Sequence, residues 1–204
     1  MNTLEKRIID ISYKKGLTHI GSCLTHVNFI DECYKQMKEG DKFVLSSGHA
    51  FLALAVVLEK HRKLDAEKLI DKHGTHPNRD LKDEILVSTG SLGQGVPIAV
   101  GMAIANPQNT IYIVSSDGEM AEGSCLEALR IAAELNLENI RLGVIANGYG
   151  AYGEIDTDWL AARLQSIYPT LMVKVNMFQY PRFLNGQSAH YHKLSKEDYE
   201  QLTQ

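Results

Sequence analysis

The sequence predicts an α/β protein with a mostly parallel central sheet and helices on both faces. Residues 110–116 and 141–146 are apolar and rich in β-branched side chains, as is typical of parallel strands that are buried on both faces. Between them, residues 121–135 carry apolar side chains at helical spacing. Strand, helix and strand in this order indicate a βαβ unit, in which the crossover brings both strand ends to one edge of the sheet.

Each of the two strands ends at a polar residue that is followed by glycine. Asp117 ends the first strand and Asn147 ends the second. Open α/β sheets bind ligands outside the carboxyl ends of their strands, so we expect these two side chains to converge in one crevice. Two oxygen donors suit Mg²⁺, which uses one or two side chains together with phosphates and water. Either dipeptide alone is more often a plain turn.

The remaining elements are predicted from the same two periodicities. In chain order they are helices at 3–13, 27–37, 46–58, 96–105 and 156–167, a helix from residue 195, and strands at 42–45 and 171–175. Residues 19–25 are predicted as a turn, and residues 65–82 as a polar connection rich in turn formers.

Length and composition favour an ordinary globular protein with one domain spanning residues 1–204. A formal net charge of −4 gives no electrostatic basis for binding nucleic acid or an anionic membrane. The longest apolar run, 50–58, is about half a membrane span. The 3 cysteines have no metal-type spacing and are expected to be reduced and mostly buried, as in a cytoplasmic protein.

A glycine-rich run, Gly-Ser-Leu-Gly-Gln-Gly at 90–95, precedes the predicted helix at 96–105. Such a run presents backbone N–H groups and the positive end of a helix dipole, which suits a phosphate. Its order, Gly-x-x-Gly-x-Gly, does not match the dinucleotide fingerprint. From these residues alone, a phosphate-binding loop and a tight turn are equally supported.

The phrase Ser-Asp-Gly-Glu-Met-Ala-Glu-Gly-Ser at 116–124, with Asn147 after it, resembles the thiamine diphosphate motif. That motif is Gly-Asp-Gly followed further along by Asn; Ser116 replaces its first glycine, and Asn147 lies 30 residues after Asp117. Its Asp-Gly-Glu-x-x-Glu-Gly part is similar to the transketolases. Further blocks resemble transketolase motifs in family order: His-Ile-Gly at 19–21, Leu-Ser-Ser-Gly-His-Ala at 45–50, His-Pro at 76–77 and Ser-Thr-Gly-Ser-Leu-Gly-Gln-Gly at 88–95.

The resemblance implies a thiamin diphosphate-binding fold that uses thiamine diphosphate and Mg²⁺. The metal ligands it implies are Asp117, Asn147 and the main-chain oxygen of Tyr149. The catalytic residues it implies, lining the substrate channel, are His19, His49 and His76. The cofactor-binding residues it implies are Gly90, Leu92, Asp117, Gly118, Glu119 and Asn147. It also places Glu122 at the interface between subunits.

The other histidines match no motif and are expected to be structural: His26, His61, His73, His190 and His192. Imidazole suits a sugar-binding channel because an ordinary pKa near ~6.5 allows both hydrogen bonding and proton transfer at neutral pH. The stretch 185–193 is expected to be a packed tail, with an interface or a substrate edge as alternatives.

Full-length transketolases carry a second, pyrimidine-binding domain whose glutamate activates the cofactor, and here the sequence ends at Gln204. We interpret the chain as the N-terminal, diphosphate-binding subunit of a split transketolase-like enzyme, whose C-terminal subunit supplies that glutamate. The implied reaction moves a two-carbon ketol unit from a ketose donor to an aldose acceptor, both sugars or sugar phosphates. Two alternatives stay open: a subunit of a 2-oxo acid decarboxylase or dehydrogenase, and a non-catalytic binding subunit.

Overall fold

A parallel four-stranded sheet in the order β1-β2-β3-β4 forms the centre of the computed structural model, which describes residues 1–150, 152–169, 172–175 and 181–203. The strands are β1 (Lys42–Leu45), β2 (Ile111–Ser116), β3 (Ile140–Ala146) and β4 (Met172–Val175). Residue 171 of the predicted strand 171–175 lies outside the described residues. All six residues of β2 are buried. The predicted parallel α/β class is therefore confirmed, with the two central strands at their predicted positions.

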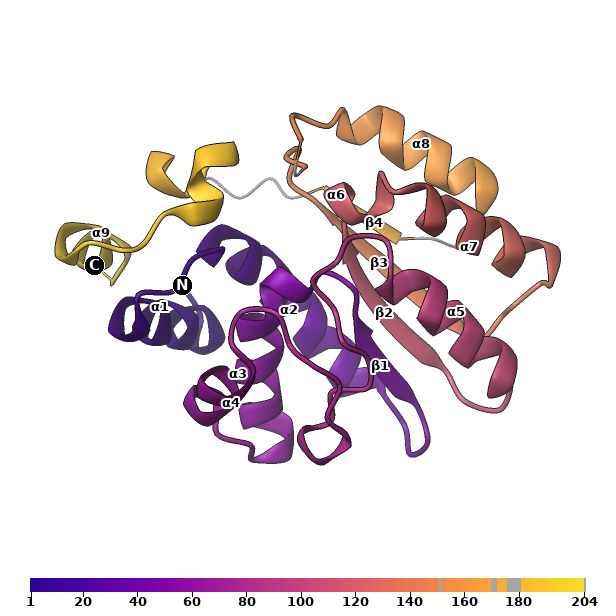
Figure 1. Cartoon of the computed structure of the whole chain (residues 1–204), viewed down its shortest axis with the longest axis horizontal. Helices are drawn as coiled ribbons and strands as arrows, with labels where there is room; N and C mark the ends of the chain where they lie inside the picture. The colour runs from indigo at the N-terminus through magenta and orange to yellow at the C-terminus, as the bar shows by residue number, and fades with distance from the viewer. Residues whose placement is uncertain (151, 170–171, 176–180, 204) are drawn as a thin grey trace.

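Helices cover both faces of this sheet (Figure 1). In chain order they are α1 (Thr3–Lys15), α2 (Ile20–Gln36), α3 (Phe51–Arg62), α4 (Ala66–His73), α5 (Gly95–Ala105), α6 (Asp117–Met120), α7 (Gly123–Glu134), α8 (Thr157–Ile167) and α9 (Lys196–Thr203). Short 3₁₀ turns are η1 (Gly48–Ala50), η2 (Leu81–Asp83), η3 (Arg182–Leu184) and η4 (Gln187–Tyr191). Helices α1 to α4 share one hydrophobic core, and α5, α7 and α8 share the other. In the described ranges, no helix is long and apolar enough to span a membrane.

Two segments predicted as a turn or a connection contain helix in the structure. The predicted turn at 19–25 is the first part of α2, which begins at Ile20. Ile20 and Leu24 are buried on the same helix face, and that burial outweighs the weak helix propensity of the glycine and serine between them. Within the stretch 65–82, which was predicted to be a polar connection, the structure contains α4, and Asp65 caps this helix by accepting the main-chain N–H of Lys68.

The end of β2 also differs from the prediction. Asp117-Gly118 is not a turn before a helix at 121–135, because α6 begins directly at Asp117. The Ser116 hydroxyl caps this helix by accepting the main-chain N–H of Glu119 at 3.3 Å. The second helix, α7, begins at Gly123 after Glu122 takes up an extended backbone conformation. The serine that replaces the first glycine of the motif therefore acts as a helix cap.

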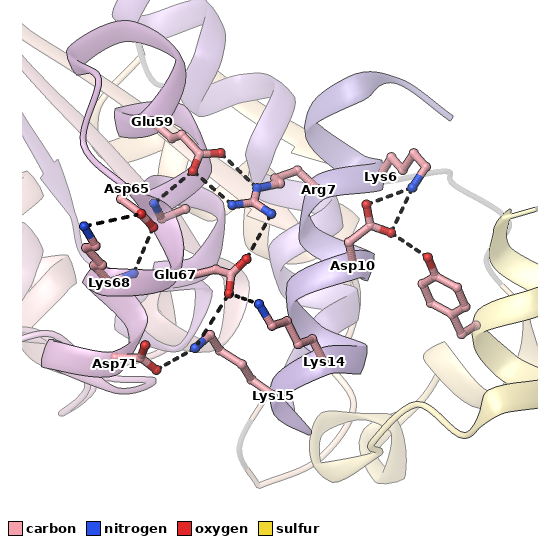
Figure 2. Close-up of polar contacts among 12 residues, drawn as sticks. Lys6, Arg7, Asp10, Lys14, Lys15, Glu59, Asp65, Glu67, Lys68 and Asp71 are labelled. Carbon is pink, nitrogen blue, oxygen red and sulfur yellow. Dashed lines mark hydrogen bonds and ion pairs between the residues drawn. The ribbon is translucent and has the colours of Figure 1, made fainter.

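Ion pairs attach α1 to the helices beside it (Figure 2). Arg7 makes two hydrogen bonds to the Glu59 carboxylate, of 2.9 and 3.1 Å, and a third of 3.2 Å to Glu67. Such two-point arginine–carboxylate pairs have a defined geometry that single exposed pairs lack. On the other side of α1, the Tyr199 hydroxyl donates to Asp10 at 2.8 Å. Helix α9 is thereby held against α1, close to where the chain leaves η4.

Candidate functional site

A cavity of about 300 Å³ lies at the carboxyl ends of β2 and β3. Its lining residues are His19, His49, His76, Gly90, Leu92, Ser116, Asp117, Gly118, Asn147, Tyr149, Gly150, Gln187, His190 and Tyr191. Nine of the eleven residues predicted for the site are in this wall, and Glu119 and Glu122 are not. Segments distant in sequence are thus brought to the strand edge where the βαβ argument placed the site.

The predicted convergence of Asp117 and Asn147 is present as direct contact. The Asp117 carboxylate, 1% exposed, accepts the main-chain N–H groups of Asn147 at 2.9 Å and Gly148 at 2.7 Å. Its other oxygen accepts the N–H of Gly118 at 2.9 Å. Burial raises the pKa of Asp117 above its ordinary value, and the three N–H donors only partly offset this rise.

These donors fit a small hard cation. The Asn147 side-chain oxygen accepts the Tyr149 N–H at 3.0 Å and keeps a second lone pair. Tyr149 pairs with Glu154 in an antiparallel bridge whose hydrogen bonds are donated by Gly150 and Ile155 to other carbonyls, so neither uses the Tyr149 carbonyl. A buried carboxylate, an amide oxygen and this carbonyl on one cavity wall match the oxygen ligands of Mg²⁺. A cation there would also compensate the buried charge of Asp117.

Three histidines from separate segments of the chain also line the cavity. His19 precedes α2 in the left-handed conformation, at φ 61°, and its Nδ1 lies 2.9 Å from the Thr18 hydroxyl. The His19 ring centroid lies 5.5 Å from that of His49 and 6.1 Å from that of His76. The predicted grouping of these three residues is therefore observed in the fold.

Two of these rings are neutral at neutral pH. Burial, with smaller contributions from His190 and His76, lowers the pKa of His19 to about 4. Burial and the neighbouring imidazoles hold the pKa of His49 well below its ordinary value. The ordinary pKa assumed from the sequence is therefore wrong for both. A neutral imidazole has one N–H donor and one acceptor, so each ring can still bind a sugar hydroxyl.

The glycine-rich loop forms the part of the cavity wall next to His76. Gly90 has φ 136°, and a Cβ at this position would lie 2.9 Å from the His76 ring. A larger residue would be strained and would displace that histidine. Leu92, two residues further on, reaches the same cavity. The loop thus brings Gly90 and Leu92 to the wall while supporting a predicted catalytic residue.

Glu119 lies behind this loop and is not among the residues of the cavity wall, and its contact with the cofactor stays a prediction. It is 1% exposed, and its Oε1 accepts the Gly93 N–H at 2.7 Å and the Ser46 hydroxyl at 3.0 Å. The Ser124 hydroxyl donates to the Gly93 carbonyl at 2.6 Å. Glu119 therefore anchors the glycine-rich loop, while Glu122 packs beside Gly93 at the start of α7.

The free energy of unfolding of the wild-type protein should fall as the pH rises, and Glu119→Gln should remove this fall. Burial, with a smaller contribution from Glu122, raises the pKa of Glu119 from 4.5 to about 7. A raised folded-state pKa stabilises the fold fully below the unfolded value and loses this effect as the pH rises through the folded value. At about 1.4 kcal/mol per pKa unit, the wild-type free energy of unfolding should fall by about 3 kcal/mol relative to the variant between pH 4 and 8.

Urea unfolding of both proteins at several pH values measures this difference. Glu39→Gln makes the same chemical change at an exposed glutamate, and it should leave the pH profile of wild type unchanged. Parallel profiles for wild type and Glu119→Gln would show that folding does not change the pKa of Glu119.

Five residues of the cavity wall were not predicted for the site: Ser116, Gly150, Gln187, His190 and Tyr191. The expectation that 185–193 is only a packed tail is therefore wrong. The main-chain N–H of His19 donates to the carbonyl of His190 at 2.8 Å, and the two rings lie 5.8 Å apart. The dense histidine and tyrosine content of this stretch was the available signal. The other histidines without a motif are structural, each bonded to a neighbour: His26, His61, His73 and His192.

Residues 15–161 match the family model described as transketolase, thiamine diphosphate binding domain. The chain belongs to the transketolase family. Its match covers every predicted site residue and ends before α9.

Components of transketolases are among the similar curated proteins. An apulose-4-phosphate transketolase subunit of Phocaeicola vulgatus is 33% identical over 156 residues, which cover 66% of this chain and 55% of that protein. The 6-deoxy-6-sulfo-D-fructose transketolase subunit SqwG of Clostridium sp. is 32% identical over 159 residues, covering 68% and 58%. The chain thus spans somewhat more than half the length of these transketolase relatives.

Solved transketolases share the fold. The transketolase of Campylobacter jejuni superposes with a TM-score of 0.69 over 85% of this chain and 36% of that one, at 21% identity. The transketolase of Leishmania mexicana gives a TM-score of 0.65 over 80% of this chain and 30% of that one, at 23% identity. At this level of identity the likeness supports the thiamine diphosphate-binding fold and leaves substrate choice open.

Proposed function

We propose that the chain is the diphosphate-binding subunit of a transketolase, which moves a two-carbon ketol unit from a ketose to an aldose. One observation carries the proposal: three oxygen donors and three motif histidines line the same cavity at the strand ends. Neither set alone specifies the reaction, because the metal ligands are shared by thiamine enzymes of several classes. The histidine blocks are what favour the transketolases.

Asp117, Asn147 and the carbonyl of Tyr149 would hold Mg²⁺ and, through it, the diphosphate of the cofactor. Gly90 and Leu92 would contact the cofactor from the glycine-rich loop, and Gly118 would do so from the first turn of α6. Thiamine diphosphate supplies the carbanion chemistry, and the protein supplies binding and orientation. Glu119 contributes indirectly, because it fixes the loop through Gly93.

The three histidines would bind the sugar hydroxyls as neutral donors and acceptors, and would exchange protons with them during transfer. Within the described part of the cavity wall, no residue is lysine or arginine. An anionic group on the substrate therefore has to find its cations elsewhere in the assembled enzyme. We therefore expect this chain to bind the reacting end of the sugar and other parts of the enzyme to bind its anionic end.

We also propose a partner for this chain, a separate pyrimidine-domain subunit, with Glu122 at the contact between the two. Both curated relatives described above are named as transketolase subunits, which supports an enzyme made of more than one chain. The half-buried Glu122 sits between the glycine-rich loop and α7, where a partner would reach the cofactor site. A single domain at 1–204 and a cytoplasmic location complete the proposal; the three cysteines are buried, as is common for the reduced cysteines of a reducing compartment.

A substrate panel tests the reaction class. The assembled enzyme is given ketose phosphates, apulose 4-phosphate and 6-deoxy-6-sulfofructose as donors, with aldose acceptors, and with pyruvate in a parallel decarboxylation assay. Ketol transfer without pyruvate decarboxylation is the expected result. Pyruvate decarboxylation alone would favour the 2-oxo acid enzymes, and no turnover with any donor would favour a non-catalytic subunit.

Alanine at His19, His49 or His76 should lower kcat/KM of the assembled enzyme by about 100-fold while cofactor affinity changes little. The reason is that the lost interactions are made to the reacting sugar, whereas the metal and the diphosphate are held by other residues of the cavity wall. Steady-state kinetics and cofactor titration measure the two effects separately. His61→Ala, outside the cavity and bonded to Asp31, is the matched control. A parallel loss of cofactor affinity in all three variants would move these residues to the cofactor pocket.

A further inference from the structure

His26 and Ser47 form a buried polar pair behind the cavity. His26 lies on α2 and is 1% exposed, and Ser47 lies between β1 and η1 and is 0% exposed. The described cavity wall contains His49, two residues beyond Ser47, but neither member of the pair. Burying an imidazole and a hydroxyl is costly unless both are hydrogen-bonded. Both side chains therefore need hydrogen-bond partners inside the protein.

The hydrogen bonds of the pair determine where its protons lie. His26 Nδ1 lies 2.7 Å from the main-chain oxygen of Ser22, which only accepts, so this nitrogen carries the hydrogen. Burial lowers the pKa of His26 to about 4, which keeps the ring neutral and leaves Nε2 as an acceptor. The Ser47 hydroxyl, 2.9 Å from Nε2, is then the donor. His26 therefore sets the orientation of the Ser47 side chain.

Ser47 begins the short turn that carries His49. Its carbonyl accepts the Ala50 N–H at 2.9 Å, which closes η1 around His49. Gly48 lies against the glycine-rich loop, where a Cβ would come within 2.6 Å of the Gly90 nitrogen. The turn has little room on that side. Because the turn cannot shift toward the glycine-rich loop, a displacement of Ser47 should also move His49.

The His49 ring depends on this turn for its position. Across residues 1–150, 152–169, 172–175 and 181–203, its nitrogens make no hydrogen bond, which leaves them available to a substrate. The His26 ring packs behind it, with centroids 6.2 Å apart and ring planes at 75°. His19 lies on the cavity side at 5.5 Å. Packing and the η1 turn are what hold His49.

We propose that His26 and Ser47 are positioning residues for His49, because their hydrogen bond holds the η1 turn so that the His49 ring faces the substrate. The proposal rests on the role given to His49 in the proposed function. If the pair only satisfied two buried polar groups, breaking it would change the stability of the protein. The position of the His49 ring and the kcat of the assembled enzyme would stay unchanged.

Imidazole NMR of the full chain tests the structural part without any activity. Two-bond ¹H–¹⁵N spectra of wild type should show His26 as the Nδ1–H tautomer. Ser47→Ala removes only the donor, and it should shift or broaden the signals of His49 as well as those of His26. Ser166→Ala, a hydroxyl on α8 that donates to the Arg163 carbonyl, is the matched control and should change neither. Unchanged His49 signals in folded Ser47→Ala would overturn the proposal.

Kinetics of the chain assembled with its pyrimidine-domain subunit tests the functional part. Ser47→Ala should lower kcat by about 10-fold, the effect of a net hydrogen bond of roughly 1.4 kcal/mol, with KM changed less than about twofold. His26→Phe should match it, and the double variant should be no worse than either. His26→Gln keeps an acceptor near the Nε2 position and should recover most of kcat.

The outcomes separate this inference from the proposed function. Additive losses in the double variant, or an unchanged kcat in Ser47→Ala, would overturn the positioning role while ketol transfer by wild type still stands. An assembled wild type without ketol transfer would contradict the proposed function, and the NMR result would still decide whether the pair holds His49. If His26→Phe does not fold, Ser47→Ala and His26→Gln give the same comparison.

Discussion

Asp117→Asn is expected to weaken Mg²⁺-dependent binding of thiamine diphosphate to the assembled enzyme by at least about 100-fold, or roughly 2.7 kcal/mol. The carboxylate is 1% exposed, so its charge acts on a bound cation with little screening by water. Asparagine has nearly the same shape and keeps one oxygen that can accept the N–H groups of Asn147 and Gly148, while its NH₂ group replaces the oxygen that accepts the Gly118 N–H. The loss therefore reports mainly the charge, with a smaller contribution from the lost hydrogen bond to Gly118, and calorimetric titration with and without Mg²⁺ measures it.

Asparagine is a sharper test here than alanine. A metal ligand at a strand end could be replaced by alanine without loss of the fold only if its side chain lay outside the core. The structure shows instead that Asp117 is buried and satisfies the N–H groups of Asn147 and Gly148. Alanine would leave these donors without a partner, at a cost of about 1–3 kcal/mol for each buried group.

The control for this experiment is Asp156→Asn. Asp156 is exposed and caps α8 by accepting the Trp159 N–H at 2.9 Å, a role that asparagine also performs. This variant makes the same chemical change outside the cavity wall, and it should bind cofactor as wild type does. Equal cofactor affinity in Asp117→Asn and Asp156→Asn would remove Asp117 from the metal site.

The chain assayed alone should show less than about a thousandth of the ketol-transfer activity that it shows with the pyrimidine-domain subunit. The carbanion chemistry belongs to the cofactor and depends on how both ends of it are held. The described cavity offers ligands for the metal and the diphosphate. We propose that the partner supplies the activating glutamate. Cofactor should therefore bind the isolated chain weakly. If thiamine diphosphate binds the assembled enzyme preferentially, a concentration of a hundred times its dissociation constant would stabilise the assembled form by about 2.7 kcal/mol.

Titrating the partner subunit into this chain, with activity and sedimentation followed together, measures the requirement. Activity should rise until the complex saturates. Asp117→Asn provides the informative control, since it should still assemble and yet restore almost no activity. Glu122→Ala should weaken assembly itself, because a half-buried carboxylate beside the glycine-rich loop is placed at the proposed contact. Full activity from the chain alone would rule out a split enzyme.

Most of the diphosphate side of the site was predictable, for a physical reason. Buried parallel strands are continuous apolar runs, and strands joined by a helix end at the same edge of the sheet. These two local rules placed Asp117 beside Asn147, and the structure joins them within hydrogen-bonding distance. The motif blocks then supplied His19, His49 and His76, whose grouping depends on loops and not on any periodicity.

The sequence by itself determined the α/β class, the parallel sheet and the edge at which the site lies, because each follows from local hydrophobic patterns and chain connectivity. Only the tertiary structure decided which further side chains share that site. His190 reaches the cavity because α9 is held on α1 and η4 lies against the start of α2. Glu119 turns behind the glycine-rich loop, and His26 pairs with Ser47. Such contacts join residues far apart in the chain, and no local pattern encodes them.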